Sequence, residues 1–333
     1  MKFDYSVVHE SWPIAGGFRI ARGAKRVADV VVVTLASGGA VGFGECVPYA
    51  RYGESVSGTM RTVRSFLGAI KALPDRQALM AQMPAGAARN AIDCALIDLE
   101  CKRSGEYAAG TLAVPRAGSL RTAYTLSLDS PEKMSSGAAH HAAWNLLKLK
   151  LGGDDISLDA ARLSAVREAA PCASLMVDAN ESWTPAYLES MLEPLEAERV
   201  VLLEQPLPAG DDEMLVALES PVPIGADESV HDSLDLVALA HRYSVLNLKL
   251  DKTGGLTRAL AVKEAARRAG LDVMVGCMVA TSLSILPAML LAGDADFVDL
   301  DGGALLARDR VGGVDYSNSI ASWPKRACWG GPA

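Results

Sequence analysis

The stretch VDANESW at residues 177–183 decides the fold, because it is an apolar run that ends in a carboxylate and is followed by a turn. Working outward from it, LLEQP at 202–206 and GADES at 225–229 repeat this arrangement. From residue 119 onward, short apolar runs alternate with longer stretches of helical periodicity, which is typical of parallel βα units. The expected strands are 124–128, 146–150, 175–178, 201–204, 224–227, 245–249, 272–276 and 297–301. These eight strands predict an α/β protein built on a modified (β/α) barrel of the TIM type.

A different pattern precedes the barrel. Residues 1–112 are expected to form an N-terminal α+β capping domain, because β-branched strands come first and helical stretches follow. The clearest helix is expected at 85–103, with Gly105 placed to end it. The expected strands are 3–9, 27–36 and 40–46, the last two joined by a turn at Ser37-Gly38-Gly39.

The remaining domain boundaries follow from the same change of pattern. The barrel is expected at 113–306. The final segment, 307–333, contains several glycines and Pro324 and shows no strong helical pattern. We expect this segment to pack back on the capping domain.

Composition and charge narrow the classes of function. The chain has 333 residues, of which 50% are hydrophobic, and a net charge of -8 without a basic stripe, which argues against a nucleic-acid partner. No apolar run approaches the roughly 20 residues that cross a bilayer, and the charged start lacks a leader, so we expect a cytoplasmic protein without a membrane partner. The six cysteines are scattered and predict neither a zinc site nor a disulfide framework.

Three consecutive expected strands end in carboxylates, at Asp178, Glu204 and Asp227. Strand ends of a parallel barrel share one mouth, so these groups are expected to lie together. Three unpaired carboxylates at close range repel one another unless a multivalent cation neutralises them, and an all-oxygen set suits Mg²⁺ better than zinc. The alternative is that these acids only cap the helices that follow.

Lysines flank the acids in strand order. Lys148 and Lys150 share one face of the second strand, and Lys249 ends the sixth, on the opposite side of an eight-membered ring. Two opposed lysines fit a mechanism in which one removes a proton from a carbon and the other returns a proton to its opposite face. Such a base must be neutral, and the metal, a neighbouring ammonium such as Lys148 and partial burial are all expected to lower its pKa. The alternative is that these lysines are solvated surface groups.

The eighth expected strand carries a pair of acids, Asp299 and Asp301, on one face and opposite the proposed metal. If the metal holds a substrate carboxylate, this pair is placed to hold an ammonium at the far end, as in a dipeptide. The alternative is one aspartate that caps a helix and one that is solvated.

Several short motifs follow one another in a specific order along nearly the whole chain. They are PYARYGES at 48–55, PAGAARNAIDCALIDL at 84–99, KLK at 148–150, VDANESW, LLEQP, GADES, NLKLDKTGG at 247–255 and DLDGG at 299–303. This ordered set resembles the muconate lactonizing enzyme subgroup of the enolase superfamily, and within it the L-Ala-D/L-Glu dipeptide epimerases of murein peptide metabolism. The resemblance implies one Mg²⁺ per subunit on Asp178, Glu204 and Asp227.

Further roles are implied by the same resemblance. Lys150 and Lys249 would be the two acid/base groups that invert the α-carbon of the C-terminal residue through a Mg-stabilised enediolate, with Lys148 as an auxiliary. Asp299 and Asp301 would hold the dipeptide ammonium. An arginine from an N-terminal loop would meet the glutamate side chain, with Arg22 as the first candidate and Arg51 as the second.

Two other functions remain open. A lyase or cycloisomerase of the same superfamily, of the o-succinylbenzoate synthase or acid-sugar dehydratase type, would share the enediolate, although the acidic pair would repel substrates that lack an ammonium. A non-catalytic barrel that binds metal or peptide would have no use for two opposed lysines. The accepted dipeptides stay open, and a homo-oligomer is possible.

Overall fold

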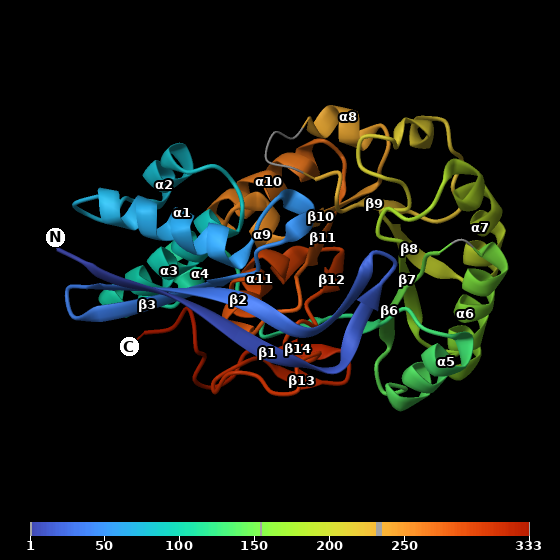
Figure 1. Ribbon diagram of the computed structural model, residues 1–333, viewed down its shortest axis with the longest axis horizontal. Helices are drawn as coiled ribbons and strands as arrows, with labels where there is room; N and C mark the ends of the chain where they lie inside the picture. The colour runs from blue at the N-terminus through green and yellow to red at the C-terminus, as the bar shows by residue number, and fades with distance from the viewer. Residues whose placement is uncertain (1, 154, 231–234, 333) are drawn as a thin grey trace.

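The computed structural model describes residues 2–153, 155–230 and 235–332 and consists of a barrel with a smaller domain at its side (Figure 1). Eight parallel strands form one sheet in the order β12-β11-β10-β9-β8-β7-β6-β5. The two edge strands approach each other, because Ala123 N donates to Val298 O at 3.0 Å. The predicted fold class, a modified barrel with a capping domain, is therefore confirmed.

All eight expected strands are present in the described part of the chain, and two of them, 146–150 and 272–276, have the expected bounds. Several others end one or two residues earlier than expected, because the chain turns into its loop before the polar residue. The strands are β5 (Tyr124–Leu126), β6 (Leu146–Lys150), β7 (Ser174–Asp178), β8 (Val200–Glu204), β9 (Ile224–Ala226), β10 (Val245–Leu248), β11 (Asp272–Gly276) and β12 (Phe297–Asp299).

The interior of the barrel is apolar at one end and charged at the other. Buried residues such as Leu146, Met176 and Val245 fill the lower layer. One level up, the register pairs Lys150 with Asp178 and Asp178 with Glu204 on neighbouring strands. Because parallel strands end at one mouth, this register gathers the charged groups there.

Helices cover the outside of the barrel, with α5, α6 and α7 lying outside β6, β7 and β8 in Figure 1. Side chains of Ser130, Asp155 and Thr184 cap the N-termini of these three helices, as expected for such residues. The helices of the barrel are α5 (Pro131–His140), α6 (Ile156–Ala169), α7 (Pro185–Ala197), α8 (Leu236–Ala240), α9 (Leu250–Thr253), α10 (Leu256–Arg268) and α11 (Ser282–Leu291), with short 3-10 turns η2 (Glu213–Val216) and η3 (Ala292–Asp294).

The capping domain pairs an antiparallel sheet with helices. Its β1–β2 hairpin is much longer than expected and extends from this domain to β6 and β7 (Figure 1). The expected helix at 85–103 is α3 (Ala87–Ser104), and Gly105 ends it in the left-handed conformation with φ 76°. The other elements are β1 (Asp4–Ile20), β2 (Gly23–Ser37), β3 (Ala40–Cys46), η1 (Ala50–Tyr52), α1 (Val56–Ala69), α2 (Arg76–Gln82) and α4 (Ala108–Leu112).

The final segment contacts both parts of the molecule. Strands β13 (Asp315–Ser317) and β14 (Ile320–Ser322) form a small sheet with β4 (Ser119–Arg121). Further along, Trp329 Nε1 donates to Cys94 O at 2.9 Å on α3. The boundaries assigned from the sequence to the three parts stay a prediction.

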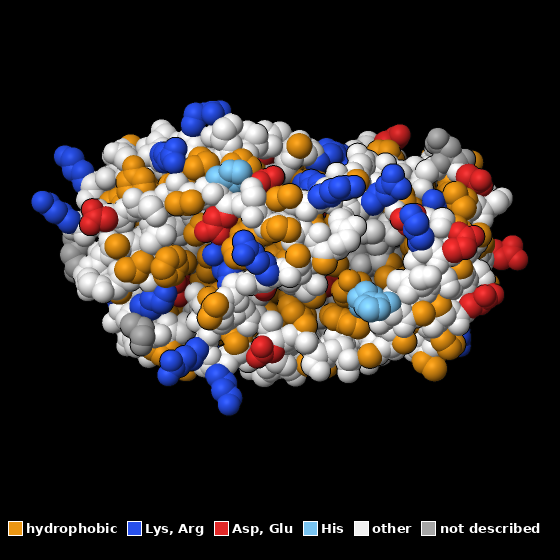
Figure 2. All heavy atoms as spheres, turned by 60° about the horizontal axis from the view of Figure 1, so that its bottom comes forward, with side chains coloured by type: hydrophobic (Ala, Val, Ile, Leu, Met, Phe, Trp, Pro, Cys, Tyr) orange, Lys and Arg blue, Asp and Glu red, His pale blue; other side chains and the backbone are white. Residues whose placement is uncertain are grey.

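The surface in Figure 2 shows acidic and basic side chains scattered among apolar ones, without a basic stripe on that face. Among the described residues, no helix is both long and apolar enough to cross a membrane.

Candidate active site

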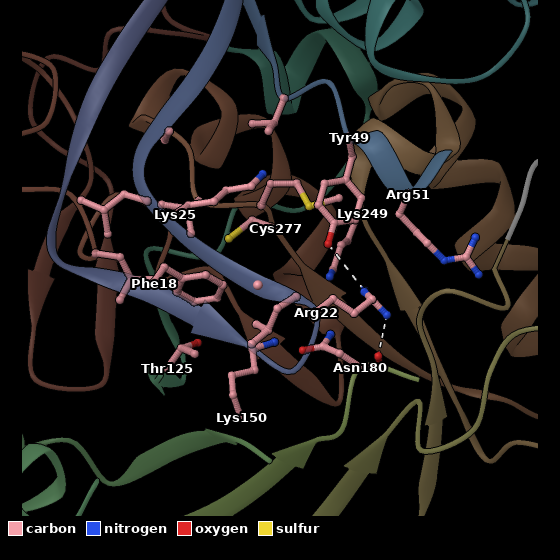
Figure 3. Close-up of a pocket in the computed structure, with 18 of the residues that line it drawn as sticks. Phe18, Arg22, Lys25, Tyr49, Arg51, Thr125, Lys150, Asn180, Lys249 and Cys277 are labelled. Atoms are coloured by element: carbon pink, nitrogen blue, oxygen red, sulfur yellow. Dashed lines mark hydrogen bonds between the residues drawn. The ribbon is translucent and has the colours of Figure 1, made fainter. Parts of the chain in front are cut away.

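A cavity of about 530 Å³ lies at the mouth of the barrel, under the β1–β2 hairpin. The hairpin supplies Phe18, Arg22 and Lys25 to its wall, and the strand ends supply the charged groups opposite (Figure 3). The loop that contains η1 adds Tyr49 and Tyr52. The cavity is therefore shared by the two domains.

The three predicted metal ligands lie together and are buried, with Asp178 and Glu204 fully so. An ammonium lies among them: Lys148 Nζ is 2.6 Å from Glu204 Oε2 and 3.2 Å from Asp178 Oδ2. Burial favours a neutral lysine, but the carboxylates of Asp299, Glu204 and Asp178 outweigh it and hold the pKa of Lys148 well above its usual range.

The two predicted acid/base lysines lie on opposite sides of the ring, since three strands separate β6 from β10 in each direction. Lys150 Nζ is 2.5 Å from Asp178 Oδ2, and Lys249 Nζ is 2.7 Å from Asp227 Oδ2. Burial again favours a neutral Lys249, but Asp227 and Glu204 outweigh it and raise its pKa well above the usual range. The expected lowering of a base lysine's pKa is therefore not seen at Lys249 while Asp227 pairs with it.

The oxygen atoms at this end of the barrel fit a hard cation. In the described ranges, no three His, Cys, Asp or Glu side chains converge closely enough to hold a metal ion. The lysine ammoniums pair with the acids instead. Among the residues that the structure describes, Asn180 Oδ1 and Glu228 Oε2 are buried without a hydrogen-bond partner, and Glu204 Oε2 pairs with the Lys148 ammonium. A carboxylate set with spare oxygens suits Mg²⁺, which prefers oxygen ligands.

The predicted ammonium-binding pair lines the same cavity. Asp301 Oδ2 accepts a hydrogen bond from Thr125 N at 2.6 Å, and Asp299 Oδ2 pairs with Lys148 at 2.7 Å. Burial and the charge of Asp299 raise the pKa of Asp301 to about 7. No donor in the described part of the chain reaches the buried Asp299 Oδ1, which leaves an acceptor for an incoming cation.

The two candidate arginines already have carboxylate partners. Arg22, at the turn of the hairpin, donates to Glu228 Oε1 at 2.5 Å and to Glu181 Oε2 at 2.7 Å. It also donates to Asn180 O at 2.5 Å (Figure 3). Arg51 makes two hydrogen bonds of 2.7 Å to Glu181 and points away from the lysines in Figure 3. Both arginines line the cavity, and their contact with a substrate stays a prediction.

Sequence reasoning missed Lys25, although it lies in the same FRIARGAKR stretch as Arg22. Lys25 lines the cavity, and its ammonium lies 5.2 Å from the centre of the Tyr49 ring. This ammonium forms no hydrogen bond or ion pair with the described residues, although its charge acts on nearby Asp29. An exposed lysine next to an arginine gives no signal in one sequence, because only the hairpin's reach over the barrel brings it to the cavity.

Lys252 was also missed, although it lies in the NLKLDKTGG motif at 247–255. Its buried ammonium pairs with Asp227 Oδ1 and donates to Asp227 O at 2.5 Å. A third bond goes to Asn247 O at 3.1 Å. Lys252 thus fixes the position of Asp227, one of the predicted metal ligands.

The backbone after β7 is strained where it lines the site. Asn180 and Glu181 both adopt left-handed conformations, with φ 46° and 65°. Residues other than glycine rarely adopt this backbone region, and each such residue costs of order 1 kcal/mol or more in conformational free energy. The hydrogen bonds of Arg22 to Asn180 O and Glu181 hold this conformation. Such strain is common at functional sites.

A buried acid beside the site carries a prediction for stability. Asp251 Oδ1 accepts bonds from Val47 N at 3.1 Å and Asn90 Nδ2 at 2.8 Å, and burial raises its pKa from 3.8 to about 7. The folded protein therefore binds this proton more tightly than the unfolded chain does, and the resulting stability is lost as the pH rises from about 4 to 7.

We expect the free energy of unfolding of Asp251→Asn to rise relative to wild type by about 2–3 kcal/mol between pH 5 and pH 8. Urea denaturation at both pH values measures it. Asp315→Asn, at an exposed position, is the control. A difference between wild type and Asp251→Asn that does not change with pH would contradict the burial argument.

The chain resembles proteins of known function over nearly its whole length. Residues 2–108 match the mandelate racemase/muconate lactonizing enzyme N-terminal domain, and residues 133–301 match the enolase C-terminal domain-like family. The L-Ala-D/L-Glu epimerase of Escherichia coli is 44% identical over 91% of this chain and 94% of its own length. The N-acetyl-D-glutamate racemase of Pseudoalteromonas is 43% identical, with 91% and 95% covered.

Solved structures agree with these relatives. An enolase family member from Agrobacterium tumefaciens, with sodium and L-Ala-L-Glu bound, is 47% identical with a TM-score of 0.94, and the match covers 98% of this chain and 100% of that one. A dipeptide epimerase from Enterococcus faecalis, complexed with Mg and L-Leu-L-Tyr, is 30% identical with a TM-score of 0.90 and 99% of each chain covered. The relatives named above are epimerases and racemases, which are isomerases that act on amino acid derivatives. The chain therefore belongs to the mandelate racemase/muconate lactonizing enzyme family of the enolase superfamily.

Proposed function

We propose that the chain is a dipeptide epimerase that inverts the α-carbon of a C-terminal residue, with an L-Ala-L-Glu type of substrate and one Mg²⁺ per subunit. One observation carries the proposal: Lys150 and Lys249 line one cavity from opposite strands of the barrel. A carbon held between them can lose a proton to one lysine and gain a proton from the other on its opposite face.

The chain's own residues divide the work of this reaction. The Cα–H bond breaks as the proton passes to Nζ of one lysine, and the other lysine donates a proton from Nζ to form the new Cα–H bond. A Mg²⁺ ion held by Asp178, Glu204 and Asp227 would neutralise the second negative charge that develops on the substrate carboxylate. Phe18, whose ring lies 5.8 Å from Lys150 Nζ, helps to exclude water on that side.

The two ends of the cavity suggest the substrate class. Asp299 and Asp301 give one end a negative charge that suits the ammonium of a free dipeptide. Lys25 gives the hairpin side a cation that forms no ion pair among the described residues, although the charge of nearby Asp29 acts on it, and Arg22 lines the same cavity. A negatively charged C-terminal side chain, such as glutamate, fits this arrangement.

The relatives leave one competing substrate class, because a racemase of N-acetyl-D-glutamate is nearly as similar as a dipeptide epimerase. An N-acetyl group has no ammonium and would bring no cation to Asp301 or to the second oxygen of Asp299, whose other oxygen pairs with Lys148. The acidic pair therefore favours the dipeptide.

The test is proton NMR in D₂O with protein and Mg²⁺, following the α-proton of the C-terminal residue. Exchange in L-Ala-L-Glu with appearance of L-Ala-D-Glu would support the proposal. Exchange in N-acetyl-L-glutamate alone would replace the dipeptide with the acylated amino acid. Absence of exchange in either compound and in a library of other dipeptides would sink the epimerase function.

Lys25→Gln should weaken recognition of the glutamate side chain. Loss of one charged hydrogen bond costs about 1.5 kcal/mol or more, so we expect kcat/KM for L-Ala-L-Glu to fall at least about tenfold. The value for L-Ala-L-Gln, which lacks the side-chain charge, should change little. Steady-state kinetics on both dipeptides measure this, and equal losses on both would show that Lys25 does not read that charge.

A further inference from the structure

Helix α3 of the capping domain carries a stripe of buried polar side chains: Arg89, Asn90 and Asp93, here called the α3 stripe. Their exposed fractions are 3%, 0% and 0%. Burial of such groups costs several kcal/mol unless each is hydrogen-bonded, so their partners are informative. None of the three lines the cavity.

All three side chains contact one short segment of the barrel, residues 249–257, which contains α9 and the start of α10. Arg89 donates from Nε to Gly254 O at 2.9 Å and from Nη2 to Thr253 O at 2.7 Å. Asn90 Nδ2 donates to Asp251 Oδ1 at 2.8 Å. At the far end of the segment, Asp93 accepts from the backbone N and hydroxyl of Thr257 at 2.9 and 2.6 Å.

This segment begins at Lys249. The carbonyl of Lys249 accepts the first hydrogen bond of α9, from Thr253 N at 3.0 Å, so the lysine's backbone is fixed to that helix. A helix of four residues is not stable by itself, and its position depends on the contacts around it. The α3 stripe supplies those contacts from the capping domain.

The two glycines of the segment show how closely α3 must approach. A Cβ at Gly254 would lie 2.6 Å from Arg89 Nε, and a Cβ at Gly255 would lie 2.5 Å from Asp93 Oδ2. Both also have positive φ, at 72° and 122°. Other residues at these positions would separate the stripe from the segment.

The opposed lysine is held differently. Lys150 is the last residue of β6, which pairs with β5 and β7 on its two sides. Within the described residues, no hydrogen bond joins the α3 stripe to β6. The α3 stripe therefore holds the segment that follows Lys249 and does not hold the strand that ends in Lys150.

We propose that Arg89, Asn90 and Asp93 are positioning residues for Lys249, so that the capping domain forms part of one half of the proton-transfer site. The inference rests on the two-lysine function proposed above. Weakening the stripe displaces Lys249 and leaves Lys150 in place, and a displacement of about 1 Å can slow a reaction up to about a hundredfold. Proton transfer should therefore slow on one face of the substrate only.

The test follows solvent deuterium exchange at the α-carbon of L-Ala-L-Glu and of L-Ala-D-Glu in separate samples, with Mg²⁺. Lys249→Ala first identifies the diastereomer whose α-proton faces Lys249. In Asn90→Ala and Arg89→Lys, exchange of that diastereomer should fall about tenfold or more relative to the other. Arg64→Lys is the control, because Arg64 donates to Val7 O within the capping domain and lies outside the stripe.

Each outcome decides a separate point. Equal losses for both diastereomers in folded variants, checked by thermal unfolding, would reduce the stripe to a structural role and overturn the proposal. Unchanged exchange in both variants would do the same. If wild-type protein exchanges neither diastereomer, the two-lysine function fails and the positioning role fails with it.

Discussion

Lys249→Ala and Lys150→Ala should each lower the rate of epimerisation by about three orders of magnitude, because general acid–base groups contribute about 10²- to 10⁴-fold. Each variant removes one face of proton transfer and keeps the other. We therefore expect Lys249→Ala to exchange the α-proton of one diastereomer with solvent, and Lys150→Ala that of the opposite one, without conversion between them. Proton NMR on each pure diastereomer measures both exchange and conversion.

The control for these lysine variants is Lys133→Ala, on the surface of α5, whose ammonium is 3.1 Å from Asp129. It should keep wild-type rates. If one variant lost exchange of both diastereomers while the other lost neither, a single base would act on both faces and the two-base mechanism would be wrong.

The barrel and the positions at its mouth followed from the sequence, because the period of the strands and their polar ends depend on local chain pattern. VDANESW and LLEQP each place a carboxylate at the last position of an apolar strand, and the register then brings Asp178 beside Glu204. Lys148 and Lys150 are two apart and so face the same interior. These are relations within one strand or between neighbours.

Contacts that cross between the domains could not be predicted in this way. The reach of β1 to Ile20 depends on a bulged pairing with β2 between Pro13 and Phe18, which no periodicity in the sequence indicates. Without it, Lys25 and Arg22 cannot be placed over the cavity. The helix at 85–103 was expected from its apolar face, but the barrel partners of Arg89 and Asn90 lie more than 150 residues away.

The ion pairs of the site explain why the pKa values of Lys148 and Lys249 are raised, whereas the sequence had suggested a lowered lysine pKa. Sequence reasoning placed a cation among Asp178, Glu204 and Asp227 and then derived a lowered lysine pKa from it. In the structure, the ammoniums of Lys148 and Lys249 pair with these acids themselves. Each lysine thereby stabilises its charged form, and a cation at the carboxylates would compete with it.

Removal of the divalent cation should abolish activity and also destabilise the fold. With Mg²⁺ at a hundred times its Kd, the folded state gains about 2.7 kcal/mol, which corresponds to a rise of a few degrees in the unfolding midpoint of a chain this size. Asp227→Asn and Glu204→Gln should lose both this rise and at least about three orders of magnitude of activity, since each removes charge that binds the ion.

Thermal unfolding with and without Mg²⁺ and EDTA measures the metal effect independently of catalysis. Asp129→Asn, an acid next to α5 and outside the cavity, should keep the full response. A rise in midpoint that survives in both Asp227→Asn and Glu204→Gln would place the ion elsewhere. Lys249 and Lys252 both pair with Asp227 in the structure, so Asp227→Asn also releases these two lysines. If Asp227→Asn lost activity but kept the normal rise in midpoint with Mg²⁺, the loss of activity would come from displaced lysines and not from loss of the ion.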